Sequence, residues 1–501
     1  MPNGPASIDR DSFRQKMAAL IDLNPLVNDE DDSWRTIMGG GVRAESPAKD
    51  APPTRGDGER TESIPAVTPP GVASSRRAST EPGEFIPRAP TALEDAGISE
   101  AQLEALVLKF MLSRATASGR EICEHVRLPF RLLRGLMRRL KEERLVVYKG
   151  EAAMSDYMHE LTDAGHDRAR RYNGQCSYVG PAPVPLDDYV AGVETQSIRH
   201  RQPKMSELRR AFGELELGDE LFSQLGQAIS SGQGMFLYGL PGNGKTSIAR
   251  RISGALGDGL WIPQAIGIHG EIIRLYDPSN HEALDEPSPS ELPRDVELDR
   301  RWIRIRRPTI VVGGELQMES LEITTNPATG LNEAPLQMKS NGGTLVIDDF
   351  GRQRITPAEL LNRWIVPLEN RHDYLNLQSG RKIEVPFDQL IIFSTNLNPA
   401  ELVDEAFLRR IPYKIDVTDP CEEQFRRLFR ETAKRLSIEH REDELDYLLE
   451  YHYRRAGRSM RFCHPRDLLH QVSVFCRFHQ LPLAVSRNAL DAAVKNYFAM
   501  M

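Results

Sequence analysis

The spacing of hydrophobic residues divides the chain into a polar N-terminal arm, a small helical unit and a long α/β region. In residues 1–96, prolines are scattered among serine, threonine, glycine and charged residues. Segments of this composition bury too little apolar surface to offset the entropy of an ordered backbone, so we expect 1–96 to be a mostly disordered arm. Within it, Phe13–Leu23 is either a short docking helix or a terminal segment that frays.

Helical periodicity begins near Ile98. A first helix is predicted by four apolar residues at helical spacing, namely Leu103, Leu106, Val107 and Phe110. Ser118 is predicted to cap a second helix that ends near Val126. A tight turn at 127–129 precedes a third helix over 130–143, 145–148 reads as a strand, and 161–166 closes the unit. This order of elements resembles a winged helix-turn-helix domain over about residues 97–172, and we place the domain at 97–175.

The third predicted helix has two different faces. Its apolar face consists of Leu132, Leu133, Leu136, Met137 and Leu140, and its basic face of Arg131, Arg134, Arg138 and Lys141. In a winged helix this element would lie in the major groove of DNA, with Arg131, Arg134 and Arg138 reaching phosphates and base edges. The alternatives are a solvated basic face or a surface that docks a protein. The acidic pair at 142–143 weighs against the DNA interpretation.

Residues 176–200 contain three closely spaced prolines and read as a linker. From residue 201 to the end, the sequence predicts one continuous α/β region that acts as a unit. Three apolar runs there are typical of buried parallel strands, and they are Met235–Tyr238, Thr344–Ile347 and Leu390–Asn396.

Composition narrows the compartment and the partners. The 501 residues carry a net charge of −8, which argues against a chain that coats nucleic acid but allows a local basic patch. The five cysteines form no C-x-x-C pair, as expected in a reducing compartment without a disulfide framework or zinc site. No signal-type core and no run of about 20 apolar residues occurs, so we expect a soluble, cytoplasmic protein without membrane insertion.

Candidate chemistry starts directly after the first strand. Gly239–Thr246 reads G-L-P-G-N-G-K-T, a complete G-x-x-x-x-G-K-[ST] phosphate loop, and 247–252 reads as the helix that should follow it. Backbone N–H groups of such a loop surround the phosphates of ATP, and the helix N-terminus adds positive charge. Lys245 would reach the β- and γ-phosphates, and the Thr246 hydroxyl would coordinate Mg²⁺. The residues expected to hold the nucleotide are Gly239, Pro241, Gly242, Asn243, Gly244, Lys245, Thr246 and Ser247.

Polar residues end the other two strands. Asp348 is expected to hold Mg²⁺ through water. Asp349 stands where many ATPases carry the glutamate that polarises the attacking water, and its side chain is one methylene shorter. It either acts as the base through an adjusted water position or supports only slow hydrolysis. Asn396 is the first candidate for orienting water or touching the γ-phosphate, and Thr395 is the second.

Three arginines further along are candidates for the same site. Arg409 and Arg410 would point toward a neighbouring subunit, where one of them would act as an arginine finger in trans. Arg466 opens a helix of the C-terminal segment and could reach back to the nucleotide.

In this order, the phosphate loop, the Asp348-Asp349 strand, Ser394-Thr395-Asn396, Leu408-Arg409-Arg410 and Pro465-Arg466-Asp467 resemble the AAA+ ATPases over about residues 201–501. The resemblance implies an α/β P-loop NTPase core at 201–417, with a parallel sheet between helices, and an α-helical lid at 418–501. It implies ATP and Mg²⁺ as ligands and a ring oligomer, with a hexamer as the expected size. The implied roles are Walker A, Walker B, sensor 1, arginine finger and sensor 2.

The stretch 329–343 resembles the AAA+ branch with an insert in helix 2 and a β-hairpin before sensor 1. That branch includes MoxR-like ATPases, magnesium chelatase subunits and bacterial enhancer-binding activators. We expect the hairpin at Tyr374–Pro386, turning at 378–380, and the insert within 290–335. The G-A-F-T-G-A loop of the activators is absent.

Three functions are compatible with these features. The first is a chaperone-like remodelling ATPase that acts as a ring on a protein client, recruited by the arm and the winged helix. The second is a DNA-associated ATPase, such as a replication loader, transposition helper or transcription regulator. The third is a nucleotide-gated binding module with little turnover, which Asp349 supports.

Overall fold

The computed structural model describes residues 85–499 except 154, 155, 214, 216, 258, 289–292, 294 and 295. The expected arm up to residue 84, including Phe13–Leu23, lies outside the described residues. Residues 85–96 differ from the prediction of disorder, because they contain helix α2 (Leu93–Ala96) and a buried Phe85 whose ring lies 5.1 Å from that of Trp302. Across the described ranges, no helix is long and apolar enough to cross a membrane.

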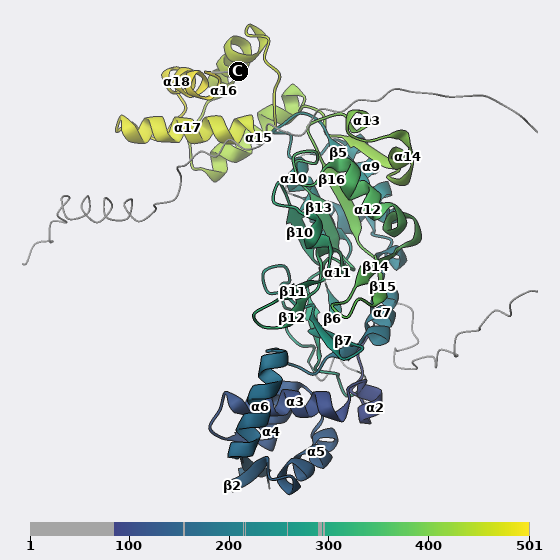
Figure 1. The fold of residues 1–501 in the computed structure, drawn as a ribbon. Helices are drawn as coiled ribbons and strands as arrows, with labels where there is room; N and C mark the ends of the chain where they lie inside the picture. Colours follow the sequence, from purple (N-terminus) through teal and green to yellow (C-terminus); the bar gives the residue numbers. More distant parts are fainter. Residues whose placement is uncertain are drawn as a thin grey trace, which may run out of the picture. The chain divides into compact units, whose positions relative to one another are not determined.

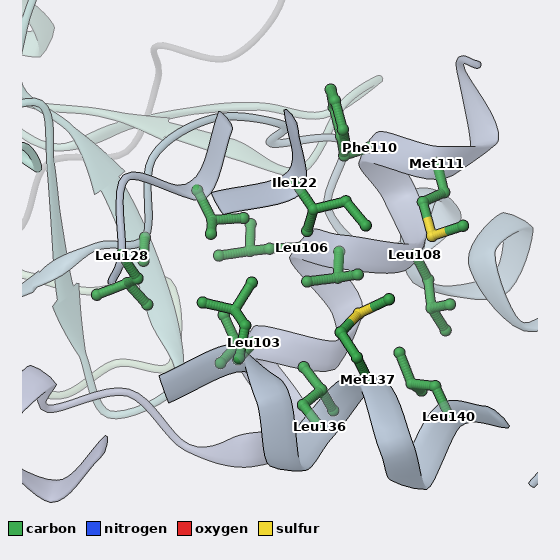
Figure 2. Close-up of a cluster of buried hydrophobic side chains, with 14 of the residues drawn as sticks. Leu103, Leu106, Leu108, Phe110, Met111, Ile122, Leu128, Leu136, Met137 and Leu140 are labelled. Carbon is green, nitrogen blue, oxygen red and sulfur yellow. The ribbon is translucent and has the colours of Figure 1, made fainter. Parts of the chain in front are cut away.

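The N-terminal unit contains the three predicted helices, which are α3 (Glu100–Leu112), α4 (Gly119–Val126) and α5 (Phe130–Glu142). The cap at Ser118 is also confirmed, since its side chain accepts a hydrogen bond from the Glu121 N–H. Side chains of these helices point toward one another in a common apolar core (Figure 2). A short strand, two longer strands and a last helix complete the unit, namely β1 (Ala117–Ser118), β2 (Val146–Ala152), β3 (Asp156–Leu161) and α6 (Asp163–Gln175). The strands form an antiparallel sheet in the order β1-β3-β2.

The segment 176–200 is structured, in contrast to the predicted linker. It contains β4 (Val184–Pro185), α7 (Leu186–Thr195) and the short 3₁₀ helix η2 (Ile198–His200). Tyr189 of α7 is buried and its hydroxyl accepts a hydrogen bond of 2.9 Å from Asn341 Nδ2. The apolar side of α7 packs this segment against the α/β region.

A five-stranded parallel sheet forms the centre of the α/β region, in the order β10-β13-β16-β5-β17 (Figure 1). The strands are β5 (Met235–Tyr238), β10 (Thr309–Val312), β13 (Thr344–Ile347), β16 (Leu390–Ser394) and β17 (Tyr413–Asp416). Because strand residues alternate between faces, Met235 and Leu237 contact one apolar cluster while Phe236 contacts the other. The three predicted strands are confirmed, and the two outer ones were missed.

Helices cover both faces of this sheet, as the prediction required. One face packs against α8 (Met205–Phe212), α9 (Asp219–Ser231), α10 (Lys245–Ala249) and η3 (Ile252–Ala255). The other packs against α12 (Pro357–Asn370) and α14 (Glu405–Arg410), with the short α13 (Pro399–Leu402) beside α14. Trp364 of α12 is fully buried on this second face.

Within 290–335, the segment predicted to hold the insert, the apolar run at 309–312 is β10, an outer strand of the central sheet. Additional strands lie on both sides of β10 in sequence. They are β6 (Leu260–Pro263), β7 (Ala265–Ile268), β8 (Glu271–Arg274), β9 (Trp302–Ile305), β11 (Thr324–Asn326) and β12 (Leu331–Glu333). The short 3₁₀ helix η4 (Met318–Leu321) lies between β10 and β11, and helix α11 (Leu336–Lys339) follows β12. Strands β11, β12, β8, β7 and β4 form a second sheet in that order, which we call the insert sheet.

The predicted hairpin is confirmed as β14 (His372–Asn376) and β15 (Lys382–Pro386). Its inner residues Leu375 and Ile383 pack into the same apolar cluster as the insert sheet and α7. At its turn, the backbone N–H groups of Gln378 and Ser379 donate hydrogen bonds of 3.3 and 3.1 Å to the Glu271 carboxylate. The hairpin is therefore fastened to the insert sheet.

The C-terminal segment is helical, as predicted. It consists of α15 (Glu422–Arg435), α16 (Glu442–Tyr447), a π-helix over Leu448–Arg454, α17 (His464–Phe478) and α18 (Arg487–Tyr497). Their apolar sides form a cluster of their own, with Phe425, Phe429 and Leu468 fully buried.

Candidate nucleotide site

The phosphate loop lies between β5 and α10, where the motif predicted it. Gly239, Gly242 and Gly244 have φ angles of 131°, 87° and 84°, a region that residues with a Cβ rarely adopt. A Cβ at Gly239 would lie 2.6 Å from the Val417 carbonyl oxygen, so glycine is required there for close approach as well. Helix α10 begins earlier and ends sooner than the predicted 247–252, and Pro241 and Ser247 are exposed. The loop is thus shaped as a cradle for an anion.

The Lys245 amine is buried beneath this loop. Its Nζ donates hydrogen bonds to the carbonyls of Gly239 (2.8 Å) and Leu240 (3.1 Å) and to Asn396 Oδ1 (2.7 Å). Burial lowers the pKa of Lys245, while the nearby carboxylates of Asp348 and Asp349 oppose this shift. The Lys245 amine therefore lies against the phosphate loop, where it could bind a phosphate group held by the loop.

Thr246 and Asp348 meet at the same edge of the sheet. The Thr246 hydroxyl donates to Asp348 Oδ2 over 2.9 Å, with Oδ1 at 3.1 Å. Asp348 follows β13 directly, and its N–H donates to the Val312 carbonyl of β10 over 2.8 Å. Hydroxyl and carboxylate oxygens are the ligands that Mg²⁺ prefers, so the two residues fit the predicted metal role.

Asp349 has a φ of 50°, a left-handed conformation that is uncommon for a residue other than glycine. Its carboxylate is exposed and accepts a hydrogen bond of 3.3 Å from Asn396 Nδ2. Asn396 thus contacts the lysine through its oxygen and Asp349 through its nitrogen. This arrangement joins the predicted phosphate-binding amine to the predicted base.

The turn after Asp349 is held by residues to which the sequence assigned no such role. Gln353 donates from Nε2 to the Asp348 carbonyl over 2.8 Å, and the Phe350 N–H donates to the Ser394 carbonyl over 2.7 Å. The Thr395 hydroxyl donates to the Phe350 carbonyl over 3.1 Å. Thr395, the second candidate for touching phosphate, is therefore engaged in holding this turn. Gln353 had no signal in the sequence, because its role depends on the loop conformation.

The lid contacts the phosphate loop through residues other than the one predicted. Arg466 is 68 % exposed in its side chain and pairs with its neighbour Asp467 over 2.9 Å. In its place, Arg461 forms an ion pair with Asp419. Asp419 in turn accepts a hydrogen bond of 2.8 Å from Asn243 Nδ2 of the loop.

A second contact runs along the backbone. The Cys463 N–H donates to the Gly242 carbonyl over 3.0 Å. A Cβ at Gly242 would lie 2.5 Å from Cys463 Sγ, so the glycine permits this close approach. Arg466 therefore pairs within its own turn in this structure, and Arg461 is the lid arginine linked to the loop through Asp419.

Arg409 and Arg410 lie on α14 and differ in surroundings. Arg410 Nε pairs with Glu369 Oε1 of α12 over 2.6 Å, and its Nη1 donates to the Ala406 carbonyl over 3.0 Å. Arg409 is exposed.

The three arginines predicted to contact DNA also differ. Arg131 pairs with Glu297 over 2.9 Å and donates to the Pro90 carbonyl over 3.0 Å. Arg134 and Arg138 are exposed on α5, and within the described residues neither forms an ion pair.

Sheet order, loop position and site geometry together define a class. The phosphate loop follows β5, which lies next to the edge strand β17, and the two carboxylates follow β13. Asn396 follows β16, the strand between β5 and β13. With the helical segment after β17, this is an α/β P-loop NTPase core with a C-terminal helical lid.

Comparisons with known proteins add the following. Residues 421–496, which span most of α15–α18, match the family model described as "Domain of unknown function (DUF8689)". No curated protein matches the sequence.

Solved structures with a partial likeness include NtrX from Brucella abortus, at 16 % identity, with 56 % of each chain covered and a TM-score of 0.36. The same protein in complex with ATP matches at 17 % identity, over 59 % of this chain and 60 % of that one, with a TM-score of 0.35. The Thermotoga maritima RuvB Holliday junction branch migration motor matches at 12 % identity, over 56 % and 70 %, with a TM-score of 0.32. This chain thus spans less than two thirds of the length of the NtrX structures, and the fold assignment rests on the sheet order above.

Proposed function

We propose that this protein is a Mg²⁺-dependent ATPase. The observation that carries the proposal is that two sets of contacts meet at the carboxyl end of one parallel sheet. Thr246 donates to Asp348, and Asn396 contacts both Lys245 and Asp349. The phosphate-binding, metal-binding, base and water-orienting roles each have a residue of the right chemistry there, although these residues follow three separate strands. Ligands of open α/β sheets bind at this edge.

The residues suggest the following division of labour. Lys245 would exchange the carbonyls of Gly239 and Leu240 for phosphate oxygens, and its position next to Asn396 would bring the γ-phosphate close to that side chain. Asp349 would accept a hydrogen bond from the attacking water, with Asn396 fixing its carboxylate. Mg²⁺, when bound by Thr246 and Asp348, would neutralise charge on the β- and γ-phosphates.

Phosphate release by the purified full chain tests this proposal. We expect Mg²⁺-dependent release from the wild type, none from Lys245→Ala, and a loss with Asp348→Asn that added Mg²⁺ only partly restores. A conservative control is Ser206→Ala, because this exposed side chain lies on α8, outside the motif. Wild-type protein that binds ATP but releases no phosphate under any condition would contradict the proposal and favour a nucleotide-gated binding module.

The fold further supports action as a ring oligomer, for which a hexamer is the expected size, on a protein client. AAA+ sites of this type take an arginine from the next subunit, so activity per subunit should rise with concentration. We assign the N-terminal unit to the winged-helix class from its α3-β1-α4-α5-β2-β3 order, and propose it as the client-recruiting element. We also propose that the chain belongs to the branch that contains the MoxR-like ATPases, a proposal that the insert sheet and the hairpin support.

DNA is the second candidate partner, and a specific surface favours it. Arg134 and Arg138 are exposed on α5, and the neighbouring strands carry Tyr148 and Tyr157, stacked at 4.7 Å and 38 % and 46 % exposed. Lys141 lies 3.7 Å from the centre of the Tyr148 ring. Cationic and aromatic side chains together are typical of nucleic-acid surfaces.

Binding to a random-sequence duplex, measured across a salt series, separates the two partners. If DNA binds here, the joint change Arg134→Ala and Arg138→Ala should lower the log–log salt slope by about 2. Arg170→Ala on α6 is the matched control, since this arginine is also exposed. Equal slopes for all three proteins, or no binding, would leave the protein client as the better proposal.

A further inference from the structure

Large apolar side chains are exposed at one end of the C-terminal helical segment, the lid. Two loops meet there, one between α15 and α16 and the other between α17 and α18. The Glu439 N–H in the first loop donates to the Leu483 carbonyl in the second over 3.1 Å. The exposed apolar residues on these loops and on the last turns of α17, which we call the lid patch, are Leu436, Val474, Phe478, Leu481 and Leu483.

Backbone geometry brings the residues of the lid patch close to one another. Val474 and Phe478 are four positions apart on α17 and lie on the same side of that helix. The Leu481 N–H donates to the Cys476 carbonyl over 2.9 Å, which folds the following loop back on the helix end. Phe478 is 80 % exposed, more than any other large apolar residue in the described ranges. Apolar groups gathered in this way and bordered by polar residues are typical of a surface that binds a partner.

The lid patch is distinct from the nucleotide site. Helix α17 begins beside the phosphate loop, since the Cys463 N–H donates to the Gly242 carbonyl over 3.0 Å. The 15 residues of this helix extend over about 22 Å, and the patch lies at its other end. Occupation of the patch therefore requires no contact with the phosphate loop.

Basic side chains border the lid patch, namely Lys434, Arg435 and Arg477. All three are exposed, and within the described residues the first two form no ion pair. The acidic residues nearest to these two in the sequence are Glu431 and Glu439, so the border carries a small net positive charge. A partner that combines apolar residues with carboxylates would complement this surface.

One segment of the N-terminal arm has this composition. Its apolar residues Phe13, Met17, Leu20 and Ile21 follow helical spacing, and an acidic run at 29–32 and Trp34 come after them. Two basic and five acidic residues give the segment 13–34 a net charge of −3. The later part of the arm, 43–84, is far poorer in large apolar residues, which are Ile64, Val67 and Val72.

We propose that segment 13–34 of the arm docks on the lid patch, with its apolar residues against Phe478 and its acidic run near Lys434. Apolar content and opposite charge together select this occupant over the rest of the arm. Residues 35–84 join the segment to Phe85, and a chain of that length can extend over about 165 Å, so the segment is not confined to the neighbourhood of Phe85. The contact needs no ATP hydrolysis and is therefore independent of the proposed ATPase activity.

Trp34 reports on this contact. The other tryptophans of the chain, Trp261, Trp302 and Trp364, are buried, so acrylamide in the solvent reaches them poorly. Acrylamide quenching of the full chain, corrected with the Trp34→Phe variant, therefore measures the exposure of Trp34. We expect a quenching constant well below that of a synthetic peptide of residues 10–36, which has no lid to bind.

Changes on either side of the contact should release the segment. Phe478→Ser combined with Leu481→Ser should raise the quenching constant of Trp34 to the value of the peptide. Phe13→Ser combined with Leu20→Ser should do the same from the side of the arm. The thermal midpoint should stay close to that of the wild type in the lid variant, because both altered side chains are exposed.

Met205→Ser is the matched control, because Met205 is 56 % exposed on α8, outside the lid. It should keep the quenching constant of the wild type. The charges are tested by Lys434→Glu combined with Arg435→Glu, which should raise the constant through repulsion from the acidic run. Replacement of residues 29–32 by lysine in the same chain should lower it again, and failure of this rescue would contradict the charge pairing.

Three results would overturn the proposal. If Trp34 is as accessible in the full chain as in the peptide, the segment is not docked. If its protection survives the changes at Phe478 and Leu481, the segment binds elsewhere. If a second copy of the chain covers the patch instead, light scattering should show a smaller mass for the lid variant, while the changes in the arm affect neither mass nor quenching.

Discussion

Lys245 and Asn396 are joined by a hydrogen bond of 2.7 Å although they are 151 positions apart in the sequence. Asn396 also donates to Asp349, so one amide contacts the phosphate-binding lysine and the candidate base together. A group that holds both partners affects the orientation of the reacting atoms more than the binding of ATP.

We therefore expect Asn396→Ala to lower kcat by roughly 10²-fold while KM for ATP changes little. Asn398→Ala is a suitable control, because Asn398 is a nearby exposed amide that caps only α13. Steady-state phosphate release over a range of ATP concentrations measures both parameters. A rise in KM with unchanged kcat would mean that Asn396 serves only binding.

Asp349 combines a chemical role with an uncommon backbone conformation. Both Asp349→Gly and Asp349→Ala should lose about 10²- to 10⁴-fold in turnover and still bind ATP. They should differ in stability, because alanine at a φ of 50° is less favourable than glycine by about 1 kcal/mol. Thermal unfolding should rank glycine above alanine, and the reverse order would show that the left-handed conformation is not retained.

Two lid arginines provide a matched pair. Arg461→Ala removes the partner of Asp419, which holds Asn243 of the phosphate loop, so we expect about tenfold weaker ATP binding. Arg466→Ala removes only an exposed pair with its neighbour and should bind ATP like the wild type. Titration with a fluorescent ATP analogue measures both. The opposite ranking would restore Arg466 as the lid residue that senses nucleotide.

His464 makes the stability of the lid depend on pH. Burial, helped by Arg461 and opposed by Asp467 and Asp419, lowers its pKa to about 4. The unfolded chain has an ordinary histidine pKa of about 6.5 and so binds the proton more readily than the folded lid. Stability from neutral His464 is therefore complete above pH 6.5 and is lost as pH falls toward 4.

His464→Gln keeps a polar side chain next to Tyr453, whose hydroxyl lies 2.9 Å from His464 Nδ1, and removes the titration. The thermal midpoint of the wild type relative to this variant should fall by a few degrees between pH 7 and 5. Parallel pH curves for the two proteins would contradict the assigned shift.

Local sequence patterns predicted most strands of the central sheet but not the long-range pairing of its outer strands. The three inner strands and the hairpin were predicted because their apolar runs are bounded by glycine or polar residues at Gly239, Asp348 and Gly380. Strand β10 was assigned to the insert because only its parallel pairing with β13, a long-range contact, makes it part of the central sheet.

The residues of the site likewise fall into those that the sequence predicted and those that it did not. Lys245, Thr246, Asp348 and Asn396 carry motif spacing and lie where the motif places them. Gln353, Asp419 and Arg461 had no such spacing, since their roles arise from loops that meet only after folding. Arg466 was favoured by its position at the start of α17, but its side chain pairs within its own turn.

The insert sheet has apolar residues on both faces. Ala265 and Ile272 contact the core of the N-terminal unit, while Ile266 and Ile273, one position further along each strand, contact the hairpin and α7. Strand β4, from the segment before residue 201, forms one edge of the same sheet.

A fragment that starts at residue 201 would therefore lose an edge strand and uncover an apolar sheet face at the same time. Unpaired edges next to apolar surface promote aggregation. The shortest stable piece of this protein that contains the phosphate loop should accordingly begin near Phe85, ahead of the N-terminal unit. Such a piece keeps strand β4 at the edge of the insert sheet and keeps the N-terminal unit packed on one face of that sheet.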